Sequence, residues 1–209
     1  MTGVRIKVCG LTRLDDVAAA AAADVDAVGF VLWPGSPRAV DVDLAARLAA
    51  ALPPWTVRVG VFVSTSVDAV AAAVRHAGLG AVQLHGIADP APYLALGVPV
   101  LWSASLRDGA PDPTAPPGTT LMVDAYDPRR HGGTGQPVDW TRAAAIARRE
   151  PLVLAGGLTA DNVAIAIAKV RPYGVDVSSG VEDAPGIKSP ARLQAFVAAA
   201  RRTTHEAHA

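Results

Sequence analysis

The sequence predicts an α/β fold, namely a single-domain (β/α)8 TIM barrel. Short runs rich in β-branched residues alternate with longer Ala-rich runs, and eight of the short runs can be distinguished. Strands that alternate with helices imply parallel strands joined by helical crossovers. The 209 residues allow about 26 for each of eight units, which is enough for a strand, two short loops and a helix. This length lies near the lower end of the range for the fold, ~200 to 400 residues.

Strands are expected where β-branched residues cluster between turn residues. The predicted strands are Val4–Cys9, Asp26–Leu32, Val57–Val63, Ala81–His85, Val98–Ser103, Thr120–Asp124, Leu152–Ala155 and Val175–Ser178. An open, doubly wound sheet is the alternative, but it needs only five or six strands, and no GxGxxG motif follows the first strand. The count of eight therefore favours the closed barrel.

Helices are expected where Ala, Leu and Arg dominate, because these residues are good helix formers. The predicted helices are Leu14–Ala23, Asp43–Leu52, Val67–Ala77, a short Ala91–Leu96, Asp139–Arg149, Thr159–Val170 and Pro190–Arg202. The candidate N-caps are Asp43, Ser66, Thr159 and Ser189. Residues 106–118 carry four prolines and no helical period, so the fifth helix is expected to be vestigial or missing. We expect residues 1–203 to form the barrel and residues 204–209 to be a frayed tail.

The composition excludes several classes of protein. With 51% apolar residues, and 19 Lys plus Arg balancing 19 Asp plus Glu, the chain is expected to fold rather than stay disordered. A general nucleic-acid binder needs a positive excess, and no uncharged run approaches the ~20 residues that cross a bilayer, so neither partner is expected. One cysteine cannot form an internal disulfide, and charges occupy the N-terminal segment where a signal peptide is apolar. These features predict a cytoplasmic protein and leave its oligomeric state open.

The alternation of side chains along each strand predicts which residues face the barrel interior. In the third strand we expect the all-valine face, from Val57 to Val63, to meet the helices, and the face with Arg58 and Phe62 to point inward. In the other strands the inward face collects polar residues: Lys7, Cys9, Gln83, His85, Asp124, Asp176 and Ser178. Burying an unpaired charge is costly, so these groups are expected to pair, contact solvent or meet a ligand.

Several of these polar residues fall at the carboxyl ends of their strands, where barrel enzymes place their chemistry. They are Cys9, His85, Asp124, and Ser178 or Ser179. Each has a purely structural alternative. A lone cysteine is often a small buried apolar residue, the aspartate could cap a turn, and the histidine could be a core residue with satisfied hydrogen bonds.

Glycine-rich turns follow the late strands, at residues 131–135, 155–158 and 178–181. The last two follow the seventh and eighth strands, where barrels commonly hold a phosphate through exposed backbone N–H groups. Arg38, after the second strand, is a further candidate for binding an anion, and the alternative is an ordinary solvated loop arginine.

Seven motifs carry a resemblance to a known family. They are KVCGLT at 7–12, VGFVLWPGSPR at 28–38, VGVFV at 59–63, VQLHG at 82–86, VDA with HGGTGQPVDW through Trp140, LAGGLTADNV at 154–163 and VDVSSGVEDAPGIKS at 175–189. In this order they resemble the phosphoribosylanthranilate isomerase family of tryptophan biosynthesis. The departure from the family pattern is the segment 106–118, where the family has more helix.

The resemblance implies an activity and a set of residue roles. The activity is the Amadori rearrangement of N-(5-phosphoribosyl)anthranilate to 1-(2-carboxyphenylamino)-1-deoxyribulose 5-phosphate, with no metal or organic cofactor. Asp124 is similar to the general acid of the family and Cys9 to its general base. Arg38, His85 and Gly133 are expected to contact the substrate. The phosphate is expected at Gly156, Gly157, Ser178, Ser179 and Gly180.

The thiolate, rather than the thiol, is the base, and a free thiol with a pKa near 8.5 is only slightly ionised at neutral pH. We therefore expect Lys7, two residues before Cys9 on the same face of the strand, to favour the thiolate. Three other functions stay open. They are a histidine-pathway or dual-substrate sugar isomerase, whose members resemble one another in having aspartate where Cys9 stands, a Schiff-base aldolase that uses Lys7, and a phosphate-binding barrel without catalysis.

Overall fold

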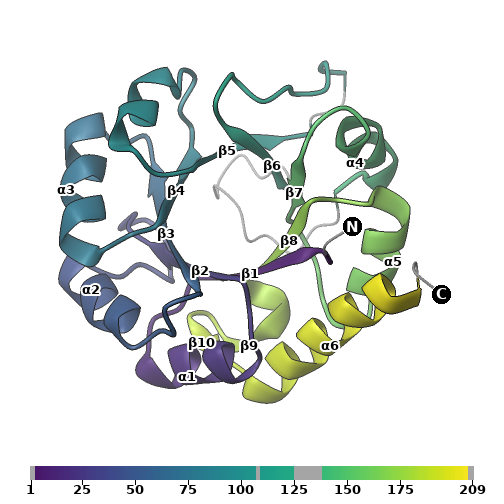
Figure 1. Cartoon of the computed structure of the whole chain (residues 1–209), viewed down its shortest axis with the longest axis horizontal. Coiled ribbons are helices and arrows are strands. Elements are labelled where there is room, and N and C mark those ends of the chain that lie inside the picture. The colour runs from purple at the N-terminus through teal and green to yellow at the C-terminus, as the bar shows by residue number, and fades with distance from the viewer. Residues whose placement is uncertain (1–2, 107–108, 125–137, 207–209) are drawn as a thin grey trace.

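Eight parallel strands close into a barrel in the computed structural model, which describes residues 3–106, 109–124 and 138–206. The strands are β1 (Arg5–Cys9), β2 (Ala27–Val31), β3 (Val57–Val63), β4 (Ala81–His85), β5 (Val100–Ser105), β6 (Thr120–Asp124), β7 (Leu152–Leu154) and β8 (Gly174–Val177). Each strand pairs with the next along the chain, and β8 pairs with β1 to close the barrel (Figure 1). The predicted fold class is confirmed.

A ring of helices surrounds the strands (Figure 1). The helices are α1 (Leu14–Ala22), α2 (Val42–Ala50), α3 (Val67–Ala77), the 3-10 helix η1 (Ala91–Leu96), α4 (Trp140–Ala147), α5 (Val163–Val170) and α6 (Pro190–Glu206). Residues 109–119, in the connection between β5 and β6, contain no helix, as their prolines predict. After β8 the chain forms the 3-10 helix η2 (Ser179–Val181) and an antiparallel hairpin of β9 (Glu182–Ala184) and β10 (Ile187–Lys188), neither of which is among the predicted elements.

The helix caps agree with the sequence in one case and differ in two. Ser66 caps α3 as predicted, since its side chain accepts a hydrogen bond from an amide in the first turn. The cap of α2 is Asp41 and not Asp43, which lies inside the helix. The cap predicted at Thr159 is also wrong. There the side chain of Asn162 accepts from the amide of Thr159, so a turn precedes the helix and α5 begins only after it.

The prediction for the two faces of β3 is wrong. Val61 packs inside the barrel in one apolar cluster with Cys9 and Val31, whereas Phe62 belongs to the main core between the barrel and its helices. Arg58 also points outward, and its guanidinium donates to the carbonyls of Ala49 and other residues at the end of α2. The interior of a (β/α)8 barrel is itself packed with branched apolar side chains, so an all-valine face fits it well.

Candidate active site

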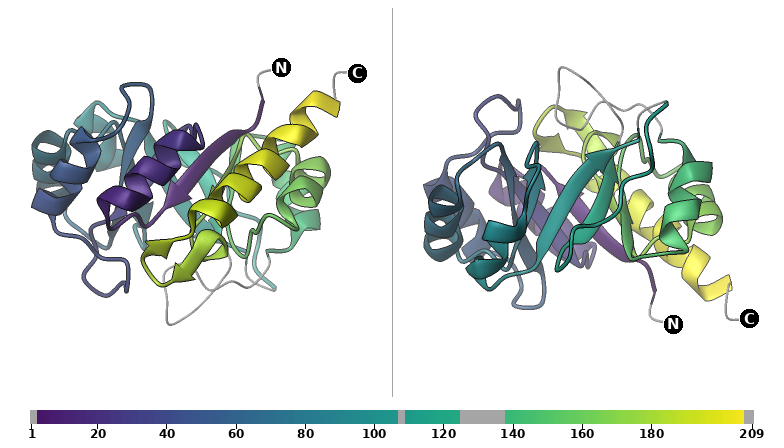
Figure 2. Two further views of the ribbon diagram at one scale, coloured as in Figure 1. Left: turned by 90° about the horizontal axis from the view of Figure 1, so that it is seen from below. Right: turned by 90° about the horizontal axis from the view of Figure 1, so that it is seen from above.

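The structure gathers most of the predicted site residues at the carboxyl end of the barrel. Cys9, His85 and Asp124 are the last residues of β1, β4 and β6, and parallel strands end at the same edge. Arg38 lies in the loop after β2, and the two glycine turns follow β7 and β8. Figure 2 shows the β9–β10 hairpin at one end of the barrel and, at the other end, the start of β1 and the end of α6. Gly133 lies outside the described residues.

Cys9 lies inside the barrel, with only 7% of the residue exposed. A Cβ added to Gly29 of β2 would lie 2.7 Å from the Cys9 sulfur and 3.2 Å from Nζ of Lys7, so glycine makes room for both groups. Lys7 forms a buried ion pair with Asp176, with 2.8 Å between Nζ and Oδ1. Burial raises the pKa of the Cys9 thiol, and the positive charge of Lys7 opposes this rise. Lys7 thus lowers the pKa of the thiol, as expected, but burial raises this pKa by more than Lys7 lowers it.

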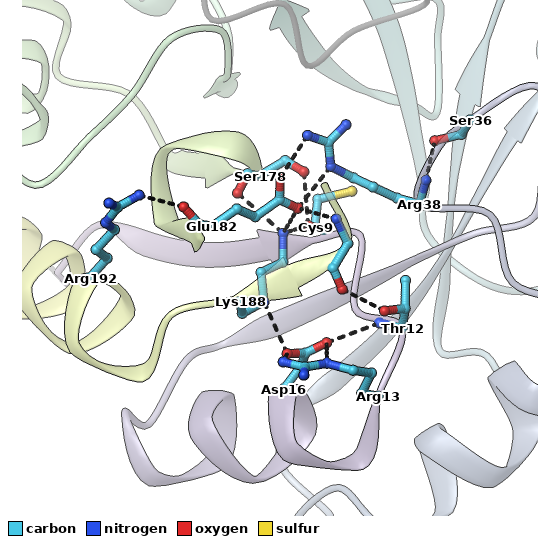
Figure 3. Close-up of polar contacts among 11 residues, drawn as sticks. Cys9, Thr12, Arg13, Asp16, Ser36, Arg38, Ser178, Glu182, Lys188 and Arg192 are labelled. Atoms are coloured by element: carbon cyan, nitrogen blue, oxygen red, sulfur yellow. Dashed lines mark hydrogen bonds and ion pairs between the residues drawn. The ribbon is translucent and has the colours of Figure 1, made fainter. Parts of the chain in front are cut away.

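A second buried lysine reaches the same region from the hairpin (Figure 3). The side chain of Lys188 is 0% exposed. Its Nζ donates to the carbonyl of Cys9 at 2.6 Å, to the carbonyl of Ser178 at 3.1 Å and to Oε1 of Glu182 at 2.8 Å. The hydroxyl of Ser178 also donates to the carbonyl of Cys9, at 3.0 Å. These bonds tie the end of β1 to the turn after β8.

Arg38 is held by Glu182 and is not a solvated loop arginine, because only 13% of its side chain is exposed. Its Nε and Nη2 donate to the two carboxylate oxygens at 2.8 and 2.7 Å. Burial opposes ionisation of Glu182, but hydrogen bonds from Arg38 and Lys188 hold the pKa of its carboxyl below the usual value. The guanidinium is therefore fixed by one edge, and Nη1 is turned away from Glu182 (Figure 3).

The stem of Arg38 packs directly on Gly10, which has a φ of +79°. A Cβ there would lie 2.6 Å from Cδ of Arg38 and 3.3 Å from the hydroxyl of Ser178. We expect Gly10→Ala to cost about 1–2 kcal/mol of stability, because of its left-handed backbone, and to raise the KM for substrate by displacing Arg38. Gly78→Ala is the matched control, since Gly78 has a φ of +59° and a Cβ added there would meet no atom within 4 Å.

Thermal unfolding and steady-state kinetics distinguish the two glycine variants. Both are expected to lose stability, and only Gly10→Ala is expected to change KM. Equal KM values for the two variants would show that the position of Arg38 does not matter for binding.

The two glycine turns meet at the end of the barrel. Gly156 and Gly157 both have positive φ values, of 87° and 66°. A Cβ on Gly180 would lie only 1.9 Å from the carbonyl oxygen of Leu158, so the turn after β8 lies directly against the turn after β7. Ser179 begins η2, and the first amides of a helix have no carbonyl partner within it. The backbone amides of such turns can hold a phosphate without a basic surface.

His85 and Asp124 occupy other parts of the same rim. His85 is buried, and its Nε2 lies 2.7 Å from Nε2 of Gln83 and 3.3 Å from the hydroxyl of Ser103. The contact with Ser103 links β4 to β5. Asp124 is half-buried beside Ser105 of β5, and β7 and β8 separate its strand from β1.

Sequence reasoning did not single out Glu182 and Lys188, although both lie in the last of the seven motifs. The signal that was present is their spacing across a Pro-Gly turn, which predicts a hairpin. Among the described residues, no group of three or more His, Cys, Asp or Glu is arranged to hold a metal ion. In the same part of the chain, no helix is long and apolar enough to span a membrane.

Comparison with known proteins assigns the family. A family model described as N-(5'-phosphoribosyl)anthranilate (PRA) isomerase matches residues 6–199. The N-(5'-phosphoribosyl)anthranilate isomerase of Chromohalobacter salexigens is 48% identical over 207 residues, which cover 97% of this chain and 97% of that protein. The crystal structure of phosphoribosyl anthranilate isomerase from Thermus thermophilus has a TM-score of 0.83 and 37% identity, covering 94% of this chain and 98% of that one.

A further structural neighbour carries a ligand. It is a phosphoribosyl anthranilate isomerase in complex with reduced 1-(o-carboxyphenylamino)-1-deoxyribulose 5-phosphate, with a TM-score of 0.81 and 31% identity, covering 95% of this chain and 99% of that one. The matches span nearly the full length of both partners and include the strands that carry the site. This chain belongs to the N-(5'-phosphoribosyl)anthranilate isomerase family.

Proposed function

We propose that this chain catalyses the Amadori rearrangement of N-(5-phosphoribosyl)anthranilate to 1-(2-carboxyphenylamino)-1-deoxyribulose 5-phosphate, a step of tryptophan biosynthesis, in the cytoplasm. The observation that carries the proposal is the direct hydrogen-bonded connection between the backbone of Cys9, which bears the buried thiol, and the glycine turn after β8. The carbonyl of Cys9 accepts hydrogen bonds from both Lys188 and the hydroxyl of Ser178. A base on β1 therefore lies next to a turn suited to a phosphate. The ligand of the structural neighbour is a phosphorylated product analogue, which supports this assignment.

The proposed reaction needs one acid and one base. Asp124 donates a proton to the ring oxygen of the ribose, the C1–O bond breaks, and the anilino nitrogen becomes part of a protonated Schiff base. The Cys9 thiolate then removes the proton from C2, and the electron pair of that bond forms an enolamine. Tautomerisation of the enolamine gives the ketone.

Binding groups hold the two anionic ends of the substrate apart. Arg38 is proposed to bind the anthranilate carboxylate with the edge that Glu182 leaves free. The turns that contain Gly156, Gly157, Ser178, Ser179 and Gly180 are proposed to bind the phosphate through their backbone amides. His85 and Gly133 are proposed as further substrate contacts.

The protonation of Cys9 fits this order of events. Burial raises the pKa of the thiol in the free protein, so the thiolate is a minor species at neutral pH. The Schiff base that forms on ring opening is cationic, and a positive charge beside the sulfur lowers the pKa of the thiol. The Cys9 thiolate is thus favoured at the step in which it removes the proton from C2.

The loss of phosphoribosylanthranilate fluorescence on addition of the purified protein tests the proposal. We expect turnover of this substrate and none of the histidine-pathway substrate. Turnover of both would make the chain a dual-substrate isomerase, and binding without turnover would make it a binding barrel. Borohydride is not expected to trap Lys7 on a carbonyl substrate, because its ammonium is buried and paired with Asp176. Binding alone, or a trapped Lys7, would contradict the proposal.

A further inference from the structure

The proposed mechanism gives no role to Lys188, a buried cation beside the site. We propose that Lys188 is a positioning residue for this reaction, which holds the base Cys9, the turn of Ser178 and the partner of Arg38 in one fixed arrangement. The inference rests on the proposed function, because these three residues take their roles from it.

The hydrogen bonds of Lys188 are complete and point to three different segments. An ammonium has three N–H donors, and here they reach the carbonyl of Cys9 on β1, the carbonyl of Ser178 after β8 and the carboxylate of Glu182 on β9. The backbone is held as well, since the amide of Lys188 donates to Oδ1 of the buried Asp16 in α1 at 3.0 Å (Figure 3). Both ends of the side chain are therefore fixed.

Packing alone does not explain a lysine at this position. Lysine is almost never fully buried unless it is paired, and an apolar side chain of similar length fills the same space without desolvating a charge. A buried ion pair is weak support for stability, because the cost of removing the two charges from water offsets their attraction. The remaining explanation for a buried lysine here is that it holds Cys9, Ser178 and Glu182 in place.

Lys188 also acts on the sulfur through its charge. Among the residues that the structure describes, the charged groups that act on Cys9 are Lys7 of β1, Asp176 of β8, Lys188 of β10 and Arg38 after β2. Burial raises the pKa of the thiol; Lys7 and Lys188 lower it, and Asp176 raises it. Because Lys188 approaches from the hairpin and Lys7 from the strand, the thiolate is stabilised by cations from two separate elements.

The link to Arg38 passes through a single carboxylate. Oε1 of Glu182 accepts from Lys188 and from Nε of Arg38, both at 2.8 Å, and from the amide of Gly186 at 3.2 Å. A charge-assisted pair of this kind fixes the plane of a guanidinium. The free edge of Arg38 is thereby presented in one direction.

The first test is Lys188→Met, with Lys169→Met as the matched control, because Lys169 is exposed in the last turn of α5. Lys188→Met is expected to lower kcat/KM on the order of 100-fold, the effect of a small misplacement of reacting groups. The acid limb of its kcat/KM profile is expected to move to higher pH. Lys169→Met is expected to match the wild type in both. If Lys188 had a purely structural role, Lys188→Met would reduce the fraction of folded protein but leave the midpoint of the acid limb at the pH of the wild type.

A folded Lys188→Met protein with a kcat/KM within twofold of wild type and an unshifted acid limb would overturn the inference. If Lys188→Met does not fold, the variant Glu182→Gln tests whether the hydrogen-bond network of Lys188 and Glu182 positions Arg38. This variant keeps nearly the same shape and keeps an acceptor for Lys188. It is expected to raise KM about tenfold, the effect of losing one charge-assisted hydrogen bond to Arg38, with kcat nearly constant. An unchanged KM would show that the network does not position Arg38.

A measurement without substrate separates this inference from the proposed function. Cys9 is the only cysteine in the sequence, so the rate of its alkylation by iodoacetamide as a function of pH reports its ionisation. The midpoint is expected at higher pH in Lys188→Met than in wild type and in Lys169→Met. If the wild type does not turn over phosphoribosylanthranilate, the proposed function fails, while the alkylation midpoint still decides whether Lys188 acts on Cys9.

Discussion

Replacement of Cys9 by alanine is expected to lower kcat for phosphoribosylanthranilate by about 100- to 10,000-fold, the usual contribution of a general base. The KM is expected to change little, because the proposed contacts with the carboxylate and the phosphate are made by other residues. Steady-state kinetics followed by the loss of substrate fluorescence measures both constants. Since a loss in kcat alone indicates an interaction made in the transition state, this pattern would assign the thiol to the chemistry.

Two companion variants make the Cys9 result specific. Asp124→Ala is expected to show a loss of the same order, because no acid then protonates the ring oxygen. Val61→Ala is the packing control: Val61 belongs to the same small apolar cluster as Cys9 but carries no titratable group. It is expected to lose stability while keeping most of its kcat. A Cys9→Ala protein with kcat within tenfold of wild type, or a Val61→Ala protein as inactive as Cys9→Ala, would remove Cys9 from its role.

The barrel could be predicted from the sequence because its signals are local. The boundaries of β3, β4 and β6 match the prediction, since β-branched runs there end at turn residues. The orientation of β3 could not be predicted, because a barrel strand is buried on both faces and its valines fit either one. The contacts of Arg58 with the end of α2 decide the orientation, and they are made only in the folded chain.

The site likewise contains some residues that could be predicted from the sequence and some contacts that could not. Cys9 and Asp124 could be located because a strand end is a local feature. The pairing of Arg38 with Glu182 joins residues 144 positions apart, and that of Lys188 with Cys9 joins residues 179 apart. A single sequence contains no signal for such contacts. The Pro-Gly turn could have indicated the hairpin that carries Glu182 and Lys188, but its position against Cys9 and Arg38 is seen only in the structure.

The buried pair of Lys7 and Asp176 gives the largest expected effect on stability. Their side chains are 6% and 9% exposed, so neither charge is solvated. Burial opposes the charge on Lys7, but Asp176 and Cys9 hold the pKa of its ammonium above the usual value. Lys7→Met removes one partner and leaves a buried carboxylate, which is expected to cost about 3–5 kcal/mol of unfolding free energy. Urea unfolding followed by circular dichroism measures this loss.

The double variant Lys7→Met/Asp176→Leu removes both charges at once and is the matched control. It is expected to be more stable than either single variant, because no uncompensated charge stays buried. Losses that simply add would show that the pair is not coupled in the folded protein.

The same variants decide what Lys7 does for the thiol. In Lys7→Met, measured where the protein is folded, the alkylation midpoint of Cys9 is expected at higher pH than in wild type, because the cation nearest the sulfur along β1 is gone. In the double variant the rise is expected to be smaller, since Asp176, which raises the pKa of the thiol, is removed as well. An unchanged midpoint in Lys7→Met would leave Lys7 with a structural role alone, and Lys188 as the cation that favours the thiolate.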